Sequence, residues 1–310
     1  MIQSSSVAIR ADKLSRDFGK TNVLNKLSLN VQTGSVCALL GTNGAGKTTL
    51  LKLLMGLIQP TSGGSEVLQD AAWPRSAEML QKTGCLLDGF EPTRSTQIRH
   101  LMDISGAIGP QFDEPWIQAL LSSHGLAITR RWSTLSKGQK RWVLLAMLLC
   151  RQCDVLLLDE PADGLDPQSR IELYQLIRQQ ANDHNVTALI ATHVITDIER
   201  VADQVCILHN KSILLHADLE ELREQVHVID CDAPPSLAGL PDGVDRLYEE
   251  RGEVTQVWLR DCNGRLGAVA FEHEVRRRKA SLEELFIALT GQPKTVDRSA
   301  DGSPVAVLQS

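Results

Sequence analysis

The sequence predicts an α/β domain with a parallel sheet, followed by a small α+β domain. Three short segments are almost entirely apolar: VCALL at 36–40, VLLLD at 155–159 and TALIA at 187–191. Such strands are typical of a parallel sheet, in which helices cover both faces and every side chain is buried. QVCILH and SILLH, on either side of Asn210 and Lys211, predict a closing hairpin. The Pro- and Gly-rich segment at 232–243 then interrupts the pattern, which indicates a domain boundary.

The first domain is therefore placed at 1–220 and the second at 221–294. Three strands are expected in the second domain, VHVID, VTQVWL and LGAVAF, at 226–230, 254–259 and 266–271. A helix follows, because Ser281 and Glu284 have the spacing of a capping box, and Gly291 can end it. Residues 295–310 are polar and without period, which predicts a disordered tail.

Composition and charge exclude several classes of protein. The chain has 310 residues and a net charge of -6, which argues against a general nucleic-acid-binding protein. The basic run at 276–279 is interpreted as a solvated surface stretch. Apolar stretches such as 143–150 fall short of the roughly 18 residues that span a bilayer. Since the N-terminus also lacks the apolar core of a secretory signal, we expect a cytosolic protein.

The segment GTNGAGKT, at 41–48, has the form of a phosphate-binding loop. It follows one predicted strand and precedes the helical pattern TLLKLLMGL, which is the context that the motif requires. Gly41, Gly44 and Gly46 let successive N–H groups turn towards phosphate oxygens at the start of a helix. Lys47 is expected to reach the outer phosphates and Thr48 to bind Mg²⁺.

A pair of acidic residues follows the second apolar strand, in VLLLDEP. Open α/β sheets bind ligands at the carboxyl ends of their strands, so Asp159 and Glu160 are expected near the phosphate loop. Asp159 is predicted to hold the Mg²⁺ shell. Glu160 is predicted to be the catalytic base that polarises water for nucleotide hydrolysis.

A second turn, LSKGQ at 135–139, precedes an apolar helix and offers further N–H groups to an anion. One nucleotide does not need two such turns from one chain. The economical interpretation is that this turn serves a nucleotide held by a second copy, so that two chains enclose two ATP molecules head to tail.

The ordered set of motifs resembles the nucleotide-binding subunits of ABC transporters. LSKGQ stands where that family has LSGGQ, and VLLLDEP, ADGLDP and a lone His193 after TALIAT follow in the family order. The resemblance covers roughly residues 7–220. It implies a P-loop NTPase core of ABC type with a helical subdomain at about 88–150, and ATP and Mg²⁺ as cofactors.

The resemblance also implies individual roles. Phe18 would stack on adenine, Asp166 would lie at the dimer seam, and His193 would contact the terminal phosphate as a catalytic residue. The predicted nucleotide-binding set comprises the phosphate loop, the second turn and these flanking residues: Phe18, Gly41, Thr42, Asn43, Gly44, Ala45, Gly46, Lys47, Thr48, Thr49, Ser136, Lys137, Gly138, Gln139 and Asp166. The predicted metal set is Thr48, Asp88 and Asp159.

Two positions depart from the family pattern. Lys137 replaces a glycine of the signature, where its cation could assist phosphate binding or point to solvent, while Gly138 is kept. Asp88, in TGCLLDG, stands where the family has glutamine or glutamate. Its shorter side chain would reach a metal through a bridging water, which affects the expected turnover and coupling.

These features predict an ATPase subunit on the cytoplasmic face of the inner membrane. It would dimerise around two MgATP and drive a separate integral membrane permease. The segment SLEELFIALTG is similar to the C-terminal segment of bacterial exporter subunits, which favours export. The alternatives are a soluble ABC-type ATPase that acts as a mechanical switch without transport, and a P-loop kinase or GTPase, which would leave LSKGQ unexplained.

Overall fold

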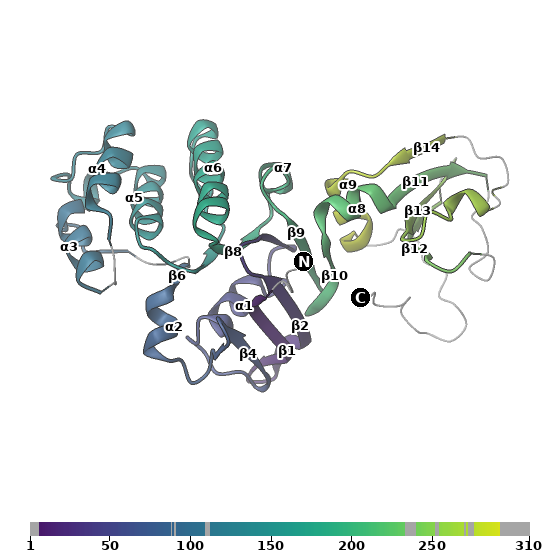
Figure 1. The fold of residues 1–310 in the computed structure, drawn as a ribbon, viewed down its shortest axis with the longest axis horizontal. Helices are drawn as coiled ribbons and strands as arrows, with labels where there is room; N and C mark the ends of the chain where they lie inside the picture. Colours follow the sequence, from purple (N-terminus) through teal and green to yellow (C-terminus); the bar gives the residue numbers. More distant parts are fainter. Residues whose placement is uncertain are drawn as a thin grey trace. The chain divides into compact units, whose positions relative to one another are not determined.

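The computed structural model describes residues 6–87, 89, 91–108, 112–232, 240–251, 254–269, 271 and 276–291 (Figure 1). The chain divides into two compact units, Met1–Ile213 and Leu214–Ser310, each considered by itself below. This division falls before the boundary that the sequence predicts after residue 220. The predicted tail at 295–310 lies outside the described residues.

A six-stranded sheet in the order β10-β9-β3-β8-β7-β6 forms the centre of the first unit, whose boundary at Ile213 falls within the last strand, β10. Its strands are β3 (Val36–Leu40), β6 (Thr83–Leu86), β7 (Val155–Asp159), β8 (Thr187–Thr192), β9 (Gln204–His209) and β10 (Ser212–Asp218). Every residue of β3, β7 and β8 is buried, and these strands pair in parallel, as the apolar segments predict. Asn210 and Lys211 both have positive φ, as a two-residue hairpin turn between β9 and β10 requires.

A second, antiparallel sheet lies beside this one and was not predicted from the sequence. It contains β1 (Val7–Phe18), β2 (Thr21–Gln32), β4 (Ser62–Val67) and β5 (Asp70–Ala71), in the order β2-β1-β4-β5. Helix α1 (Lys47–Leu54) contributes four buried leucines to a core that contains residues of both sheets. The helix that follows the phosphate loop is therefore fixed on two sides.

Between β6 and β7 the chain is mainly helical (Figure 1). After α2 (Ala77–Lys82) and β6 come α3 (Ile98–Ile108), α4 (Glu114–Ser123), the 3-10 turn η1 (Trp132–Thr134) and α5 (Lys137–Leu149). The last two helices of the first unit are α6 (Pro167–His184) and α7 (Ile195–Ile198). Helix α5 packs against both α3 and α4, so its N-terminal turn, which carries the LSKGQ motif, is held by a small helical cluster.

The second unit contains a four-stranded antiparallel sheet in the order β12-β13-β11-β14. Its elements are α8 (Leu219–Gln225), β11 (Val226–Cys231), β12 (Val244–Glu250), β13 (Thr255–Asp261), β14 (Arg276–Lys279) and α9 (Leu282–Thr290). The capping box of Ser281 and Glu284 is present at the start of α9, as predicted. The unit is therefore α+β, with its own apolar core around Ile229 and Leu259.

Several segments of the second unit differ from the sequence prediction, which did not include strand β12 or helix α8. LGAVAF was expected as a strand but instead contains the 3-10 turn η3 (Leu266–Ala268). The carboxylate of Asp261 accepts the N–H groups of Asn263, Arg265 and Leu266, which turns the chain away from an extended conformation. The basic run at 276–279 was expected as a surface stretch, and it forms the edge strand β14 with mostly exposed side chains.

Because β8 is buried in the central sheet, a cavity in this strand should strongly lower the stability of the protein. Leu189 is fully buried there, so Leu189→Ala should lower the free energy of unfolding by about 2–5 kcal/mol. Ile171→Ala, on α6 with 51% of the side chain exposed, is the matched control and should change stability by less than about 0.5 kcal/mol. Urea denaturation of both variants tests the assignment, and equal midpoints would contradict it.

Candidate functional site

The phosphate loop occupies the turn between β3, which ends at Leu40, and α1, which begins at Lys47. Gly44 and Gly46 have φ of 81° and 112°, a conformation that side chains other than that of glycine rarely adopt. A Cβ atom on Gly46 would also lie 2.7 Å from a side-chain carbon of Leu24. The two glycines therefore allow the backbone to form the cradle that the sequence predicts.

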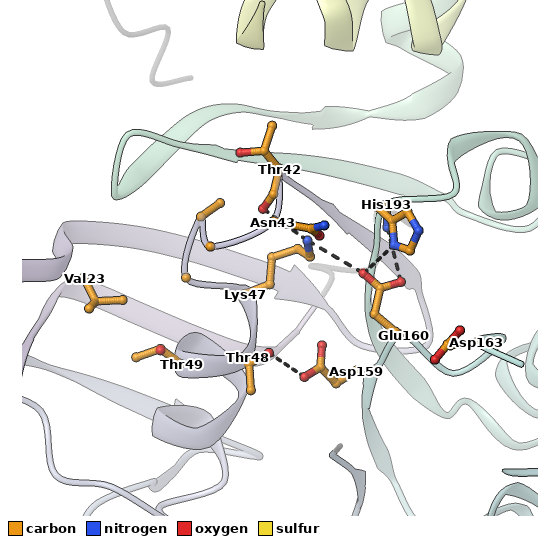
Figure 2. Close-up of a pocket in the computed structure, with 13 residues that line it drawn as sticks. Val23, Thr42, Asn43, Lys47, Thr48, Thr49, Asp159, Glu160, Asp163 and His193 are labelled. Carbon is orange, nitrogen blue, oxygen red and sulfur yellow. Dashed lines mark hydrogen bonds and ion pairs between the residues drawn. The ribbon is translucent and has the colours of Figure 1, made fainter. Parts of the chain in front are cut away.

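A cavity of about 410 Å³ opens beside this loop (Figure 2). The predicted residues that line it are Thr42, Asn43, Gly44, Ala45, Gly46, Lys47, Thr48, Thr49, Asp159, Glu160 and His193. Gly41 takes part through its carbonyl oxygen, which accepts a hydrogen bond from Lys47 Nζ at 2.7 Å. The structure thus brings three separate segments of the sequence, the 41–49 loop, the Asp159–Glu160 pair and His193, to one cavity.

Lys47 is the central cation of this cavity. Its side chain is almost fully buried, and its ammonium lies 3.8 Å from Glu160 Oε1. Burial lowers the pKa of Lys47 below its ordinary value, while the carboxylates of Glu160 and Asp159 oppose that shift. The Lys47 ammonium also lies 3.5 Å from Thr42 O, and a buried cation beside the loop is suited to bind an anion such as a phosphate.

Thr48 and Asp159 form the predicted magnesium site. The Thr48 hydroxyl donates a hydrogen bond of 2.6 Å to Asp159 Oδ2, and Asp159 is buried at the end of β7. A hydroxyl and a carboxylate are oxygen donors of the kind that Mg²⁺ accepts alongside nucleotide phosphates and water. These two residues therefore fit the ion. Asp88, the third predicted ligand, lies outside the described residues.

Glu160 and His193 are in direct contact at the cavity (Figure 2). His193 Nδ1 lies 2.9 Å from Glu160 Oε1, and the backbone N–H of His193 donates to Oε2 at 3.3 Å. β7 and β8 are neighbours in the sheet, with Asp159 paired to Ala191, so the residues after both strands must meet. Both side chains thus line the same cavity as Lys47.

Other predicted residues lie outside this cavity. Ser136, Lys137, Gly138 and Gln139 form the first turn of α5 and its cap, where Ser136 and Gln139 make a capping box. Asp166 caps α6 by accepting the N–H groups of Gln168 and Ser169. The hydrogen bond from the Ser169 hydroxyl lowers the pKa of Asp166. Phe18, at the end of β1, is 46% exposed and lies under the guanidinium of Arg16.

Three residues at or near the site were not named as site residues from the sequence. Val23 and Asp163 line the cavity, and Arg141 donates hydrogen bonds to the backbone carbonyls of Asp159, Glu160 and Pro161. Asp163 stands in the loop after Glu160, so its distance from the acidic pair could have indicated it. Arg141 belongs to none of the motifs, and only the tertiary structure identifies it.

The geometry of Lys47 predicts that it dominates nucleotide binding. Lys47→Ala should raise the dissociation constant for MgATP by at least about 10-fold, since it removes a charge-assisted hydrogen bond. Lys52→Ala, in the last turn of the same helix α1, removes the same charge away from the cavity and serves as the control. Titration calorimetry distinguishes the two, and an equal effect of both substitutions would show that only net charge matters.

Comparison with known proteins agrees with the motifs. The family model described as "ABC transporter" matches residues 24–163. The Nod factor export ATP-binding protein I of Burkholderia lata is 31% identical over 296 residues, which cover 89% of this chain and 94% of that protein. The aliphatic sulfonates import ATP-binding protein SsuB 2 of Pseudomonas fluorescens is 35% identical over 228 residues, 73% of this chain and 82% of that protein.

The fold has been seen before in solved structures. A structure described as the ATP binding subunit of an ABC transporter matches with a TM-score of 0.65 at 23% identity, over 71% of this chain and 92% of that one. The order of the motifs, the cavity at the phosphate loop and these relatives lead to one conclusion. The chain belongs to the ABC transporter family, as an ATP-binding subunit with the ATPase fold of that family.

Proposed function

We propose that two copies of this chain close head to tail around two MgATP and drive a separate membrane permease, as part of an exporter. One observation carries the proposal. The cavity at Lys47 contains the residues for phosphate binding and hydrolysis, whereas the second anion-binding turn, Ser136–Gly138, does not line it. The N–H groups of this turn can bind an anion, but the turn lies outside the cavity of its own chain. It is therefore best placed to bind the nucleotide of another copy.

The first turn of α5 has the properties that this arrangement needs. Gln139 N–H is already bound to the Ser136 hydroxyl, and Ser136 N–H to the Gln139 side chain. For the N–H groups of Lys137 and Gly138, no acceptor is found within the described part of the chain. Two unpaired donors at the positive end of a 13-residue helix favour a bound phosphate.

In the proposed reaction, each residue of the cavity has a defined task. Lys47 holds the terminal phosphates, and His193 contacts the terminal phosphate from the neighbouring strand. Glu160 accepts a proton from the water that attacks this phosphate, which is the role its position beside Lys47 and His193 supports. Thr48 and Asp159 would hold Mg²⁺, which neutralises phosphate charge when bound.

An apolar groove supports the proposed membrane partner. The groove, of about 420 Å³, is lined by Met55, Leu57, Cys85, Leu86, Leu87, Leu101, Ile104, Ser105, Leu144, Met147, Leu148 and Arg151. Leu57 and Ile104 are 45% and 55% exposed, which is unusual for large apolar residues on one surface. We assign this groove, which includes Leu86 and Leu87, to an apolar segment of the permease.

The proposed location is peripheral, on the cytoplasmic face of the inner membrane. Within the described ranges, no helix is both long and apolar enough to cross a bilayer. In this proposal the chain is held at the membrane by its permease through the groove.

The direction of transport rests on the second unit. The relative named as an export protein aligns over 89% of this chain, whereas the relative named as an import protein aligns over 73%. An alignment of 296 residues must include part of the second unit, because the first ends at Ile213. The second unit is therefore a feature shared with a protein named for export, which favours an exporter.

Removal of the proposed base tests the reaction. Glu160→Gln should lower the turnover number for ATP by about 100-fold or more, because general base catalysis contributes that much. The variant should still bind MgATP and should form a stable dimer that contains trapped ATP. Gel filtration with bound-nucleotide analysis measures this, and a fully active variant that stays monomeric in MgATP would refute the proposal.

Placing a charge in the groove tests the partner. Ile104→Glu should reduce the membrane-bound fraction in the native host by at least about 10-fold, since an unpaired carboxylate is costly to bury. ATP affinity should be unchanged, because the groove is separate from the cavity at Lys47. Ile171→Glu, equally exposed on α6, is the control, and equal membrane association of the two variants would exclude the groove.

A further inference from the structure

Glu160, the proposed base, has an uncommon backbone conformation. Its φ is 44°, in the left-handed region that residues other than glycine seldom occupy. Such a residue persists only when its surroundings hold it there. The backbone N–H of Glu160 donates to Ala191 O at 2.8 Å, which fixes one end of the residue on strand β8. Contacts from helix α5 fix the other.

Arg141, one turn into α5, supplies these contacts. Its Nη2 donates to the carbonyl oxygens of Asp159 and Glu160 at 2.8 and 2.5 Å, and its Nε donates to that of Pro161 at 3.3 Å. One planar guanidinium thus binds three successive carbonyl groups around the left-handed residue. Lysine has a single point of charge and cannot reproduce this pattern.

Lys137, four residues earlier on the same face of α5, contacts the next part of the loop. Its ammonium donates to Asp163 Oδ2 at 2.7 Å, and this hydrogen bond, ahead of other causes, lowers the pKa of Asp163. Between the two cations, a Cβ atom on Gly138 would lie 2.5 Å from Gly164 O. The first two turns of α5 therefore contact the 159–164 segment at several points.

We propose that Arg141 is a positioning residue that holds Glu160 in its left-handed conformation and ties this carboxylate to the Ser136–Gly138 turn. The inference rests on the proposed function, in which Glu160 is the base and the turn binds the partner's nucleotide. Movement of the turn when it meets that nucleotide would be passed through Arg141 to the catalytic carboxylate of its own chain. The ion pair of Lys137 and Asp163 is the solvent-exposed part of the same contact between α5 and the 159–164 loop.

Arg141→Gln tests the inference, because loss of a positioning residue should lower the turnover number for ATP and leave the affinity for MgATP unchanged. The turnover number for ATP should fall at least about 10-fold, because misplacing a catalytic group by about 1 Å costs up to about 100-fold. The dissociation constant for MgATP should stay within twofold, since Arg141 does not line the cavity. Arg141→Lys, which keeps the charge, should lose less and should remain below the parent protein.

Arg130→Gln is the matched control. Arg130 also donates to a backbone carbonyl near the turn, that of Thr134 at 2.8 Å, but among the residues that the structure describes it makes no hydrogen bond to the 159–164 loop. Its turnover should equal that of the parent. Thermal unfolding of each variant checks the fold. A turnover within twofold of the parent for Arg141→Gln, or a parallel loss of binding and thermal stability, would overturn the positioning role.

A double-mutant comparison separates this inference from the proposed function. In the Glu160→Gln background, Arg141→Gln should cause no further loss of the residual rate, because the group that it positions is already gone. A further loss of 10-fold there would overturn the inference alone. If Glu160→Gln itself keeps full turnover, the assignment of the base fails, whatever the effect of Arg141.

Discussion

The structure depends on the burial of three apolar strands, β3, β8 and β7, side by side in one parallel sheet. Their register pairs Leu40 with Thr192 and Asp159 with Ala191, so all three strands end at one edge. The phosphate loop follows β3, Asp159 is the last residue of β7 and Glu160 the next, and His193 follows β8. Apolar burial of roughly 25 cal/mol per Å² thus supplies the free energy that gathers polar groups which would not associate by themselves.

The gathered groups form contacts with one another that a bound ligand could replace. Lys47 is buried and contacts the Gly41 carbonyl and the Glu160 carboxylate, while Thr48 contacts Asp159. Each of these contacts occupies a position that phosphate oxygens or Mg²⁺ could take. Because the donors are already oriented, little reorganisation is needed on binding, which is the condition for effective electrostatic stabilisation of a developing charge.

The helical segment between β6 and β7 contributes in a different way. The N-terminal turn of its helix α5 lies outside the cavity, and Arg141 of the same helix donates hydrogen bonds to the carbonyl groups around Glu160. A left-handed residue of this kind costs on the order of 1–3 kcal/mol, which the surrounding contacts must offset. The same helix therefore belongs to two sites in the proposed dimer, one through its N–H groups and the other through its arginine.

Elements outside the main sheet show where sequence patterns fail. The antiparallel sheet was not predicted, because β1 has several register shifts and a left-handed Lys13 that disrupt the alternation of apolar and polar residues. LGAVAF has the composition of a strand, but the side chain of Asp261 bends it into a turn. Both cases depend on contacts that are not encoded in local periodicity.

The sequence by itself determined the phosphate loop, the acidic pair, the buried strands and the capping box at Ser281, since each is set by neighbouring residues in the chain. The sequence also gives the order of the motifs along the chain. Only the tertiary structure decided that His193 meets Glu160, that Lys137 meets Asp163 and that Arg141 holds the strained backbone. These contacts join residues that lie about 20 or more positions apart, and their existence depends on how strands and helices pack after each has formed.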